Sequence, residues 1–287
     1  MPVVTDPAAL AALVARLRAA GCVFAEDEAA LLVAEAADAA GLAAMAARRV
    51  AGEPLEQVLG WAEFRGLRIG VEPGVFVPRV RTGLLVQEAG RVLPGGPGRA
   101  VPGAADARPV VVDLCCGTGA VGLAVAAEHP GVALWAVDVA PAAVACARRN
   151  AAALGPADAA VLLGDLDAPL PAALAGRVDV LVANAPYVPT AEIAHMPTEA
   201  RDHEPRTALD GGADGVDLHR RVAAAAPRWL APGGHLLIET SVHQAGATAA
   251  ACEGQGLAVR VVHDEDLDGT VVVATRRTRR PHPARRA

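Results

Sequence analysis

The chain has 287 residues, of which 53% are apolar and 20% charged, and its formal charge at pH 7 is −6. This composition excludes a wholly disordered protein, and the length suits one large α/β unit or a small domain joined to a medium one. Because 26 basic residues stand against 32 acidic ones, a broad basic surface for nucleic acid is not expected.

The first 60 residues carry a helical pattern. Apolar side chains recur at three- and four-residue spacings over residues 10–17 and again over residues 29–36, and Gly21 and Gly41 are expected to separate the helices. The start of the chain lacks a basic segment followed by an apolar one, and no run of about 18 uncharged apolar residues occurs. We therefore expect a cytoplasmic protein with an N-terminal helical domain over residues 1–60.

The pattern changes after Gly60. Short β-like runs with turn signals at Gly66 and Pro73-Gly74 predict a small hairpin, and an amphipathic segment follows, so residues 61–93 are interpreted as a connecting hairpin and helix. Residues 94–109 are rich in Pro, Gly and Ala and have no periodicity, which is typical of a linker.

Seven strand-like runs follow the linker, and the first four alternate with Ala-rich helical segments. They span residues 110–114, 133–138, 160–164, 178–183, 235–240, 257–262 and 270–275. Alternation of this kind predicts a parallel sheet covered on both faces, whereas the short connection between the last two runs allows only an antiparallel hairpin at the sheet edge. We predict an α/β fold over residues 110–276: a Rossmann-like, mostly parallel seven-stranded sheet, the architecture of class I S-adenosylmethionine-dependent methyltransferases.

A glycine-rich turn follows the first of these strands. Gly117, Gly119 and Gly122 form a GxGxxG pattern between a strand and a helix, which NAD enzymes and methyltransferases share. Asp113, at the strand end, favours a cationic ligand such as S-adenosylmethionine over the anionic pyrophosphate of a dinucleotide. The alternative for Asp113 is a cap or turn residue of the following helix.

Two more acids end the next strands. Asp138 stands where a carboxylate accepts hydrogen bonds from ribose hydroxyls in either cofactor class. Asp165 could meet the adenine amino group while Leu166 packs on the ring, although a solvated loop acid remains an alternative for Asp165.

A polar tetrapeptide, residues 184–187 (NAPY), follows the fourth strand, where ligands bind in open α/β sheets. The side-chain oxygen of Asn184 and the backbone carbonyl of Ala185 can each accept one N–H of a planar NH2 group, while Pro186 fixes the turn and Tyr187 supplies a packing wall. Such a site would hold a weakly nucleophilic amide or aniline-like nitrogen for methylation.

With these motifs, the chain resembles the protein-(glutamine-N5) methyltransferase family (the PrmC/HemK type), which methylates the glutamine of the GGQ loop in class I peptide release factors. The resemblance extends from residue 52 to residue 276 and includes residues 52–79, 113–124, 184–189, 204–221 and 231–239. It implies a helical N-terminal domain, a connecting hairpin and a methyltransferase domain.

Carried over by position, the resemblance implies a set of residues for each ligand. It implies S-adenosylmethionine binding by Asp113, Cys115, Cys116, Gly117, Thr118, Gly119, Asp138, Asp165, Leu166 and Asn184. It implies glutamine binding by Phe76, Asn184, Ala185, Pro186 and Tyr187, with Asn184, Pro186 and Tyr187 catalytic. Glu204, Pro205 and Arg206 are interpreted as a loop that supports the site, and Glu239 as a pocket wall.

The chain departs from the family pattern at three places. It has NAPY where the family usually has NPPY, Arg81 replaces an acid in residues 78–83, and one of Cys115 and Cys116 occupies a position commonly filled by Gly. These departures indicate a divergent paralogue and affect the protein substrate more than the reaction.

The cysteines and histidines predict no metal site. Five cysteines without a CxxC pair argue against structural zinc and a disulfide framework, and no basic neighbour is visible to activate Cys115 or Cys116, so both are interpreted as small packing residues. His195 and His203, the histidines nearest the predicted site, are interpreted as loop or surface residues.

Other functions remain open at this stage. The acceptor could be an adenine amino group of RNA or DNA, or the chain could be a catalytically silent cofactor-binding module or an NAD-dependent oxidoreductase. We expect a monomer acting on a protein, without a stable nucleic-acid complex or membrane contact. The Arg-rich tail, residues 277–287, is interpreted as solvated, with an anionic partner as the alternative.

Overall fold

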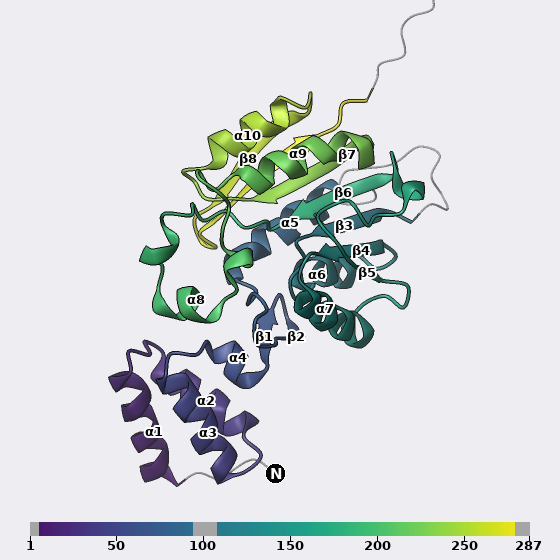
Figure 1. Ribbon diagram of the computed structural model, residues 1–287. Coiled ribbons are helices and arrows are strands. Elements are labelled where there is room, and N and C mark those ends of the chain that lie inside the picture. Colours follow the sequence, from purple (N-terminus) through teal and green to yellow (C-terminus); the bar gives the residue numbers. More distant parts are fainter. Residues whose placement is uncertain (1–5, 94–107, 279–287) are drawn as a thin grey trace, which may run out of the picture.

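The computed structural model describes residues 6–93 and 108–278. A group of N-terminal helices is followed by a two-stranded hairpin and a larger α/β unit, and the hairpin lies between the other two parts (Figure 1). Residues 94–107 of the expected linker and residues 279–287 of the expected tail lie outside the described residues. The proposed division into domains therefore stays a prediction.

The N-terminal helices share a small core that includes Leu13, Leu17 and Leu32. They are α1 (Pro7–Ala19), α2 (Ala25–Glu35), α3 (Ala39–Val50) and α4 (Leu55–Leu59). The prediction that Gly41 separates two helices is wrong, because the break falls at Asp38. The Asp38 side chain accepts a hydrogen bond from the Gly41 N–H at 2.7 Å and so caps α3.

The predicted hairpin is confirmed: β1 (Trp61–Phe64) pairs antiparallel with β2 (Leu67–Gly70). The two residues between them, Arg65 and Gly66, have φ of 51° and 75°, and positive φ at both central positions is the mark of the tight turn that suits twisted strands. A short 3-10 turn (Val80–Thr82) then leads into α5 (Gly83–Val92).

The predicted seven-stranded α/β fold is confirmed, with strand order β5-β4-β3-β6-β7-β9-β8. The strands are β3 (Val110–Leu114), β4 (Ala133–Asp138), β5 (Ala160–Leu163), β6 (Val178–Ala183), β7 (Leu230–Glu239), β8 (Ala258–Asp264) and β9 (Gly269–Thr275). All neighbours are parallel except β9, which is antiparallel to both β7 and β8.

Two details of the sheet differ from expectation. The connection from β5 to β6 contains a 3-10 turn (Ala172–Leu174) and no α-helix, since Pro169 and Pro171 leave few residues free to donate helical hydrogen bonds. Strand β7 begins at Leu230 and not at residue 235, because Leu230 pairs with Val178 ahead of an irregularity in the register.

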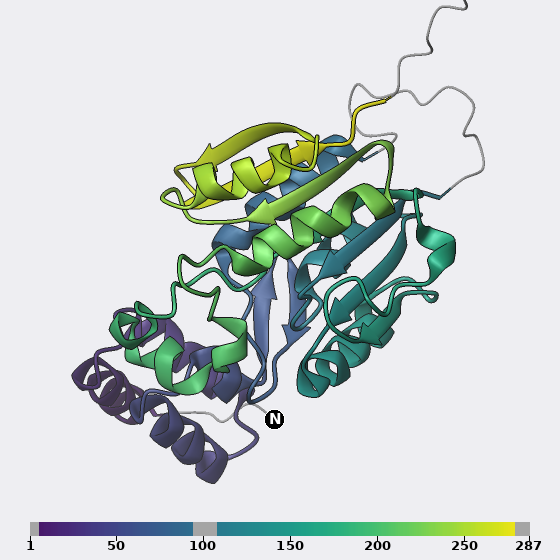
Figure 2. The ribbon, with the colours of Figure 1, turned by 45° about the horizontal axis from the view of Figure 1, so that its top comes forward.

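Helices cover both faces of the sheet (Figure 2). Helices α5, α6 and α7 pack on one face and α9 and α10 on the other, with a buried apolar cluster under each layer. The longer helices of this unit are α6 (Ala120–Glu128), α7 (Pro141–Leu154), α9 (Asp217–Trp229) and α10 (Ala245–Glu253), and the short α8 (Thr198–His203) follows β6. Over residues 6–93 and 108–278, no helix has the length and apolarity needed to cross a bilayer.

Adjacent strands β3 and β6 send their connections in opposite directions, the first through α6 toward β4 and the second through α9 toward β7. At such a reversal of strand order, the loops that leave the carboxyl ends diverge and open a crevice. The fold therefore locates a candidate site beyond Leu114 and Ala183, the last residues of these two strands.

The hairpin is attached to the sheet through Asn150 of α7. Its Oδ1 accepts from the Gly70 N–H, and its Nδ2 donates to the carbonyls of Gly70 and Thr118, each at 2.9 Å. We expect Asn150→Ala to lower the free energy of unfolding by about 1–3 kcal/mol, because it leaves buried backbone groups unpaired. Urea denaturation measures this change.

The neighbouring Arg149 provides the control. Its guanidinium pairs with Glu72 at a half-exposed position, so Arg149→Ala should cost less than about 1 kcal/mol. An Asn150→Ala protein with the urea midpoint of the wild type would contradict this view of how the hairpin is held.

Candidate active site

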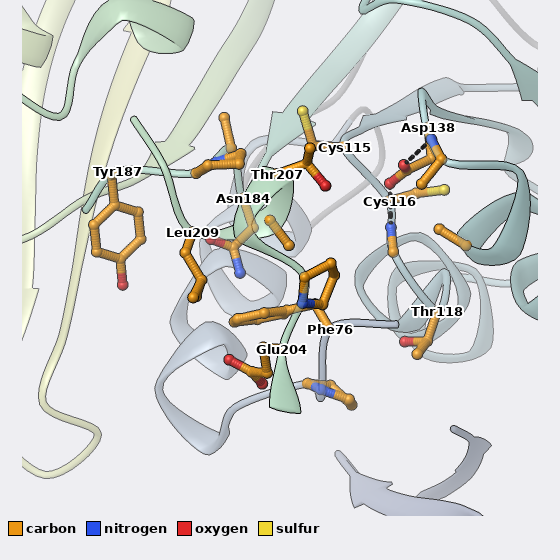
Figure 3. A pocket seen from close by; sticks show the side chains of 18 of the residues that line it. Phe76, Cys115, Cys116, Thr118, Asp138, Asn184, Tyr187, Glu204, Thr207 and Leu209 are labelled. Carbon is orange, nitrogen blue, oxygen red and sulfur yellow. Dashed lines mark hydrogen bonds between the residues drawn. The ribbon is translucent and has the colours of Figure 1, made fainter. Parts of the chain in front are cut away.

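A cavity of about 540 Å³ opens at the carboxyl ends of β3 and β6, and its walls come from both sides of the reversal (Figure 3). Of the residues singled out in the sequence for ligand binding, all but Gly119 line it. The lining includes Phe76, Asp113, Cys115, Cys116, Gly117, Thr118, Asp138, Asp165, Leu166, Asn184, Ala185, Pro186 and Tyr187. In Figure 3, Asp138, Cys116 and Thr118 form one wall, and Asn184, Thr207 and Leu209 lie opposite.

The glycine-rich turn forms the first wall. Gly117 has φ of 55°, and a Cβ added there would meet nothing within 4 Å, so its backbone is open to a ligand. Gly122 is required for packing, because an added Cβ would lie 2.8 Å from the Leu134 side chain. Gly119 is also a packing position, against Ala147. Cys115 has φ of 58°, a conformation that favours glycine, which accounts for the family's preference there.

Asp113 is buried at the base of this wall, and its Oδ2 accepts from the Gly122 N–H of α6 at 2.9 Å. Both interpretations of Asp113 therefore apply: it anchors the first turn of α6 and it lines the cavity. Burial raises the pKa of Asp113 to about 7, the bond from Gly122 opposes the shift, and the nearby charge of Asp138 adds to it. A cation in the cavity would stabilise the ionised form.

Asp138 and Asp165 end the neighbouring strands. The two carboxylate oxygens of Asp138 accept from the Gly117 N–H at 2.8 Å and the Ala140 N–H at 2.9 Å, which ties β4 to the glycine-rich turn. Asp165 pairs with Arg221 of α9 at 2.6 Å. Each oxygen retains acceptor capacity, so the turn is edged by three acids from three adjacent strands.

The thiols of the turn are not activated. Burial and the charges of Asp113 and Asp138 raise the pKa of both Cys115 and Cys116 far above the ordinary value. A protonated thiol is a poor nucleophile, so both side chains serve as packing surface. Among the described residues, no three His, Cys, Asp or Glu side chains are grouped to hold a metal ion.

The tetrapeptide forms the opposite wall, directly after β6. Asn184 Nδ2 donates to Thr82 Oγ1 at 3.4 Å, and the ring of Tyr187 directs its hydroxyl to Glu239 Oε1, also at 3.4 Å. Burial raises the pKa of Tyr187 to about 12, so its hydroxyl keeps its proton. Asn184 and Ala185 therefore supply the polar groups that this wall can offer to a ligand.

The backbone of the tetrapeptide is braced by the loop of residues 209–215. Val188, the residue after the tetrapeptide, donates its N–H to the Leu209 carbonyl and accepts from the Gly211 N–H, and Gln244 Nε2 donates to the Tyr187 carbonyl at 2.7 Å. A Cβ added at Gly211 would lie 2.7 Å from the Tyr187 Cα, and one at Gly215 would lie 2.3 Å from the Tyr187 carbonyl oxygen. The glycines of this loop therefore permit close contact with the site.

Phe76 closes the cavity from the hairpin side, near Asn184 and Glu204 in Figure 3. The guanidinium of Arg79 lies 5.3 Å from the Phe76 ring centre and donates to Glu204 at 2.6 Å. Glu204 and Pro205 line the cavity, whereas Arg206 is exposed and pairs with Asp210. Burial raises the pKa of Glu204, and the charge of Arg79 opposes the shift.

Sequence reasoning missed a covering segment contributed by the region of α8. Met196, Pro197, Glu199 and Ala200 line the cavity, and Arg49 of α3 donates to Glu199 at 2.9 Å. The helices of the first 60 residues thus help to hold one wall of the cavity. No local pattern reveals this, because Arg49 and Glu199 are 150 residues apart.

Sequence reasoning also missed two buried polar residues: Thr82, which lines the cavity, and His219, which lies behind it. The only signal for either is a polar residue next to or within an apolar helical pattern. Glu239, expected as a pocket wall, does not line the cavity but lies behind Tyr187. Neither His195, which is exposed in a 3-10 turn, nor His203, which ends α8, lines the cavity.

His219 of α9 lies behind the tetrapeptide, with its ring centre 6.3 Å from that of Tyr187 and its Nδ1 2.8 Å from Thr248 Oγ1. Burial lowers the pKa of His219 to about 4, and the nearby Ala185 carbonyl opposes part of the shift. This imidazole is therefore neutral near pH 7.

Comparisons with known proteins agree with this geometry. A family model described as "Methyltransferase small domain" matches residues 103–202. The chain is 39% identical to the release factor glutamine methyltransferase of Geobacter sulfurreducens over 70% of this chain and 65% of that relative, just under two thirds of its length. It is 39% identical to the protein of the same name from Mycolicibacterium smegmatis, over 82% of this chain and 78% of that relative.

Among solved structures, the release factor-specific protein-(glutamine-N5) methyltransferase from Alicyclobacillus acidocaldarius is 25% identical, and the match covers 72% of this chain and 98% of that one with a TM-score of 0.41. A methyltransferase from Pyrococcus furiosus is 16% identical over 74% of this chain and 90% of that one, with a TM-score of 0.49.

The buried His219 generates a pH prediction. In the unfolded chain, His219 takes up a proton as the pH falls below about 6.5, whereas in the folded protein its pKa is about 4. The free energy of unfolding should therefore decrease as the pH is lowered from 6.5 to 4. The loss relative to His219→Gln should reach about 3 kcal/mol. Urea midpoints across the pH range measure it. As a control, His243→Gln, at an exposed position, should show the same dependence of the urea midpoint on pH as the wild type. If His219→Gln also shows that dependence, the buried imidazole is not neutral.

Proposed function

Because the chain belongs to the release factor glutamine methyltransferase family, we propose that it transfers a methyl group from S-adenosylmethionine to the side-chain amide nitrogen of a glutamine in a class I peptide release factor. One observation carries the proposal: three acids and an open glycine turn share a single cavity with the oxygen acceptors of Asn184 and Ala185. The first set suits a cationic nucleoside, and the second suits a planar NH2 group.

The residues of the glycine-rich wall fit S-adenosylmethionine. This cofactor supplies an electrophilic methyl group on a positively charged sulfur. Asp113 would stabilise its positive charge, Asp138 would accept from the ribose hydroxyls, and Asp165 would meet the adenine amino group beside Leu166. Gly117 leaves room for close approach of the ligand to the backbone.

Asn184 and Ala185 orient the acceptor. An amide nitrogen is a weak nucleophile because its lone pair is delocalised into the carbonyl group. Two oxygen acceptors that each take one N–H fix the NH2 plane and direct the lone pair toward the methyl donor. Replacement of a proline by Ala185 keeps the backbone carbonyl on which this arrangement depends. Phe76 and the α8 segment exclude water from the same space.

The acidic balance of the chain supports a protein substrate over nucleic acid. We infer a monomer that contacts a release factor transiently, and we assign the activity to the cytoplasm, where release factors act on ribosomes. Transfer to an adenine amino group remains the competing outcome, since an Asn-x-Pro-Tyr tetrapeptide suits that nitrogen as well.

A labelled-methyl assay tests the proposal. The purified protein is given labelled S-adenosylmethionine with a class I release factor, with the same factor carrying Gln→Ala in its GGQ loop, and with ribosomal RNA. Label is expected in the intact release factor alone. If label enters only the RNA, the acceptor is a nucleotide base and not a glutamine. If the protein binds the cofactor but labels no partner, it is a catalytically silent binding module.

Two substitutions separate the two walls of the cavity. Asn184→Ala should lower kcat by about 10²- to 10³-fold while the affinity for S-adenosylhomocysteine stays within about twofold, because it removes a dipole that acts on the acceptor. Asp138→Ala should weaken S-adenosylhomocysteine binding first, since it also releases the Gly117 and Ala140 N–H groups. Calorimetry and initial rates check both. Full rate in Asn184→Ala would remove that residue from the mechanism.

The raised pKa of Asp113 predicts that a proton is released when the cofactor binds. With a pKa of about 7, about half of the Asp113 carboxyl groups carry a proton at pH 7, and a cation beside them would lower that pKa. We expect release of about half a proton per bound S-adenosylmethionine at pH 7, measured by calorimetry in buffers of different ionisation enthalpy. Asp113→Asn should abolish the release. Equal heats in all buffers for the wild type would contradict a cation beside Asp113.

A further inference from the structure

The carboxamide of Asn184 has two opposite ends, and only one of them serves the proposed reaction. When Asn184 Oδ1 faces the cavity, it accepts an N–H of the substrate amide. If the carboxamide is rotated by half a turn, its NH2 group faces the NH2 group of the substrate, and the two donors repel each other. The oxygen and nitrogen of an amide have nearly the same shape, so sterics alone cannot choose between these orientations. The choice must come from hydrogen-bond partners.

The partner of Asn184 is Thr82, whose Oγ1 lies 3.4 Å from Asn184 Nδ2. Thr82 is 2% exposed and ends the 3-10 turn before α5. Its hydroxyl lies close enough to the carboxylate of Glu239 to lower the pKa of that group, and we infer that it donates there. Glu239 is the last residue of β7 and also 2% exposed, and it lies beside Asn184 because Ala183 pairs with Ile238 in the sheet.

The chemistry of this chain of bonds fixes its direction. An ionised carboxylate can only accept, so the single hydroxyl proton of Thr82 goes to Glu239. The Thr82 oxygen can then only accept from Asn184, which requires the NH2 end of the amide. The Oδ1 end therefore turns away from Thr82.

Glu239 also holds the other end of the tetrapeptide. Its Oε1 accepts from the Tyr187 hydroxyl at 3.4 Å, and the Arg81 guanidinium lies 3.9 Å from the same oxygen. Burial raises the pKa of Glu239, and the positive charge of Arg81, which replaces an acid of the family pattern, opposes this rise and favours the ionised, acceptor-only form. One buried carboxylate thus contacts Tyr187 directly and Asn184 through Thr82.

We propose that Thr82 and Glu239 are positioning residues that fix the Asn184 amide with its oxygen toward the acceptor nitrogen. This inference rests on the proposed transfer to an amide nitrogen. Both bonds are long, and hydrogen bonds of this kind commonly tighten when the substrate enters. Thr82 lines the cavity and Glu239 lies behind it, and both would act through the orientation of the Asn184 amide, so their effect should appear in kcat and not in cofactor binding.

Variants of Thr82 separate the hydroxyl from the shape of the side chain. Thr82→Val keeps the volume and removes the hydroxyl, and we expect kcat to fall about tenfold with S-adenosylhomocysteine affinity within about twofold. Thr82→Ser keeps the hydroxyl and should restore most of the rate. Thr275→Val, which removes a hydroxyl at the end of β9 beside His235 and away from the cavity, should keep the wild-type rate.

Glu239→Gln tests the direction of the chain of bonds. A glutamine amide can donate to Thr82, whose hydroxyl would then donate to Asn184 and reverse the amide. We expect a fall in kcat of about 10²-fold, and the double variant with Thr82→Val should be no slower than Glu239→Gln alone, because both act through one orientation. Additive losses, or a full rate in either single variant, would overturn the proposal.

A spectroscopic measurement keeps this test independent of the substrate. The chain has two asparagines, Asn150 and Asn184, so selective ¹⁵N-asparagine labelling gives two side-chain NH2 signals, and Asn184→Ala assigns them. Thr82→Val should shift the Asn184 signal and speed its hydrogen exchange, while Thr82→Ser and Thr275→Val should leave it in place. If the Asn184 signal does not move in Thr82→Val, the contact between Thr82 and Asn184 is refuted, whether or not a release factor is the substrate. If the signal moves but no release factor is methylated, the proposed function is wrong and the contact stands.

Discussion

The reversal of strand order between β3 and β6 is the constraint on which the site depends. Parallel strands bring their carboxyl ends to one edge of the sheet, and the two connections leave in opposite directions, so the edge stays open at this point. Four polar residues of the cavity stand at or just after strand ends: Asp113, Asp138 and Asp165 on one side, and Asn184 on the other. The arrangement of the strands by itself therefore places the two walls of the cavity face to face.

Burying acids at this edge has an electrostatic cost, and backbone N–H groups offset part of it. Asp113 is anchored by Gly122 and Asp138 by Gly117 and Ala140, so the glycine-rich turn both supplies space and orients the carboxylates. The cost that remains is visible in the raised pKa of Asp113. A positively charged ligand would relieve that cost.

The opposite wall is built from segments far apart in the sequence. The continuation of the hairpin supplies Phe76 and Thr82, the segment after β6 supplies Asn184, and Glu239 at the end of β7 lies behind this wall. The α8 region closes the space and is tied to the N-terminal helices through Arg49. The helices and hairpin that precede the sheet therefore help to support the cavity.

The sequence alone determined the α/β class, the hairpin and six of the seven strands to within about two residues, because strand burial and turn chemistry are local properties. It also located both walls, since Asp113, Asp138 and Asn184 stand directly at predicted strand ends. It misplaced the start of β7 and expected a helix between β5 and β6, where pairing with Val178 and two prolines decided otherwise. Only the tertiary structure could bring Thr82 and Glu239 to Asn184 and Arg49 to Glu199. Those contacts join residues up to 150 positions apart, and no periodicity encodes which buried polar groups will meet when helices and strands pack.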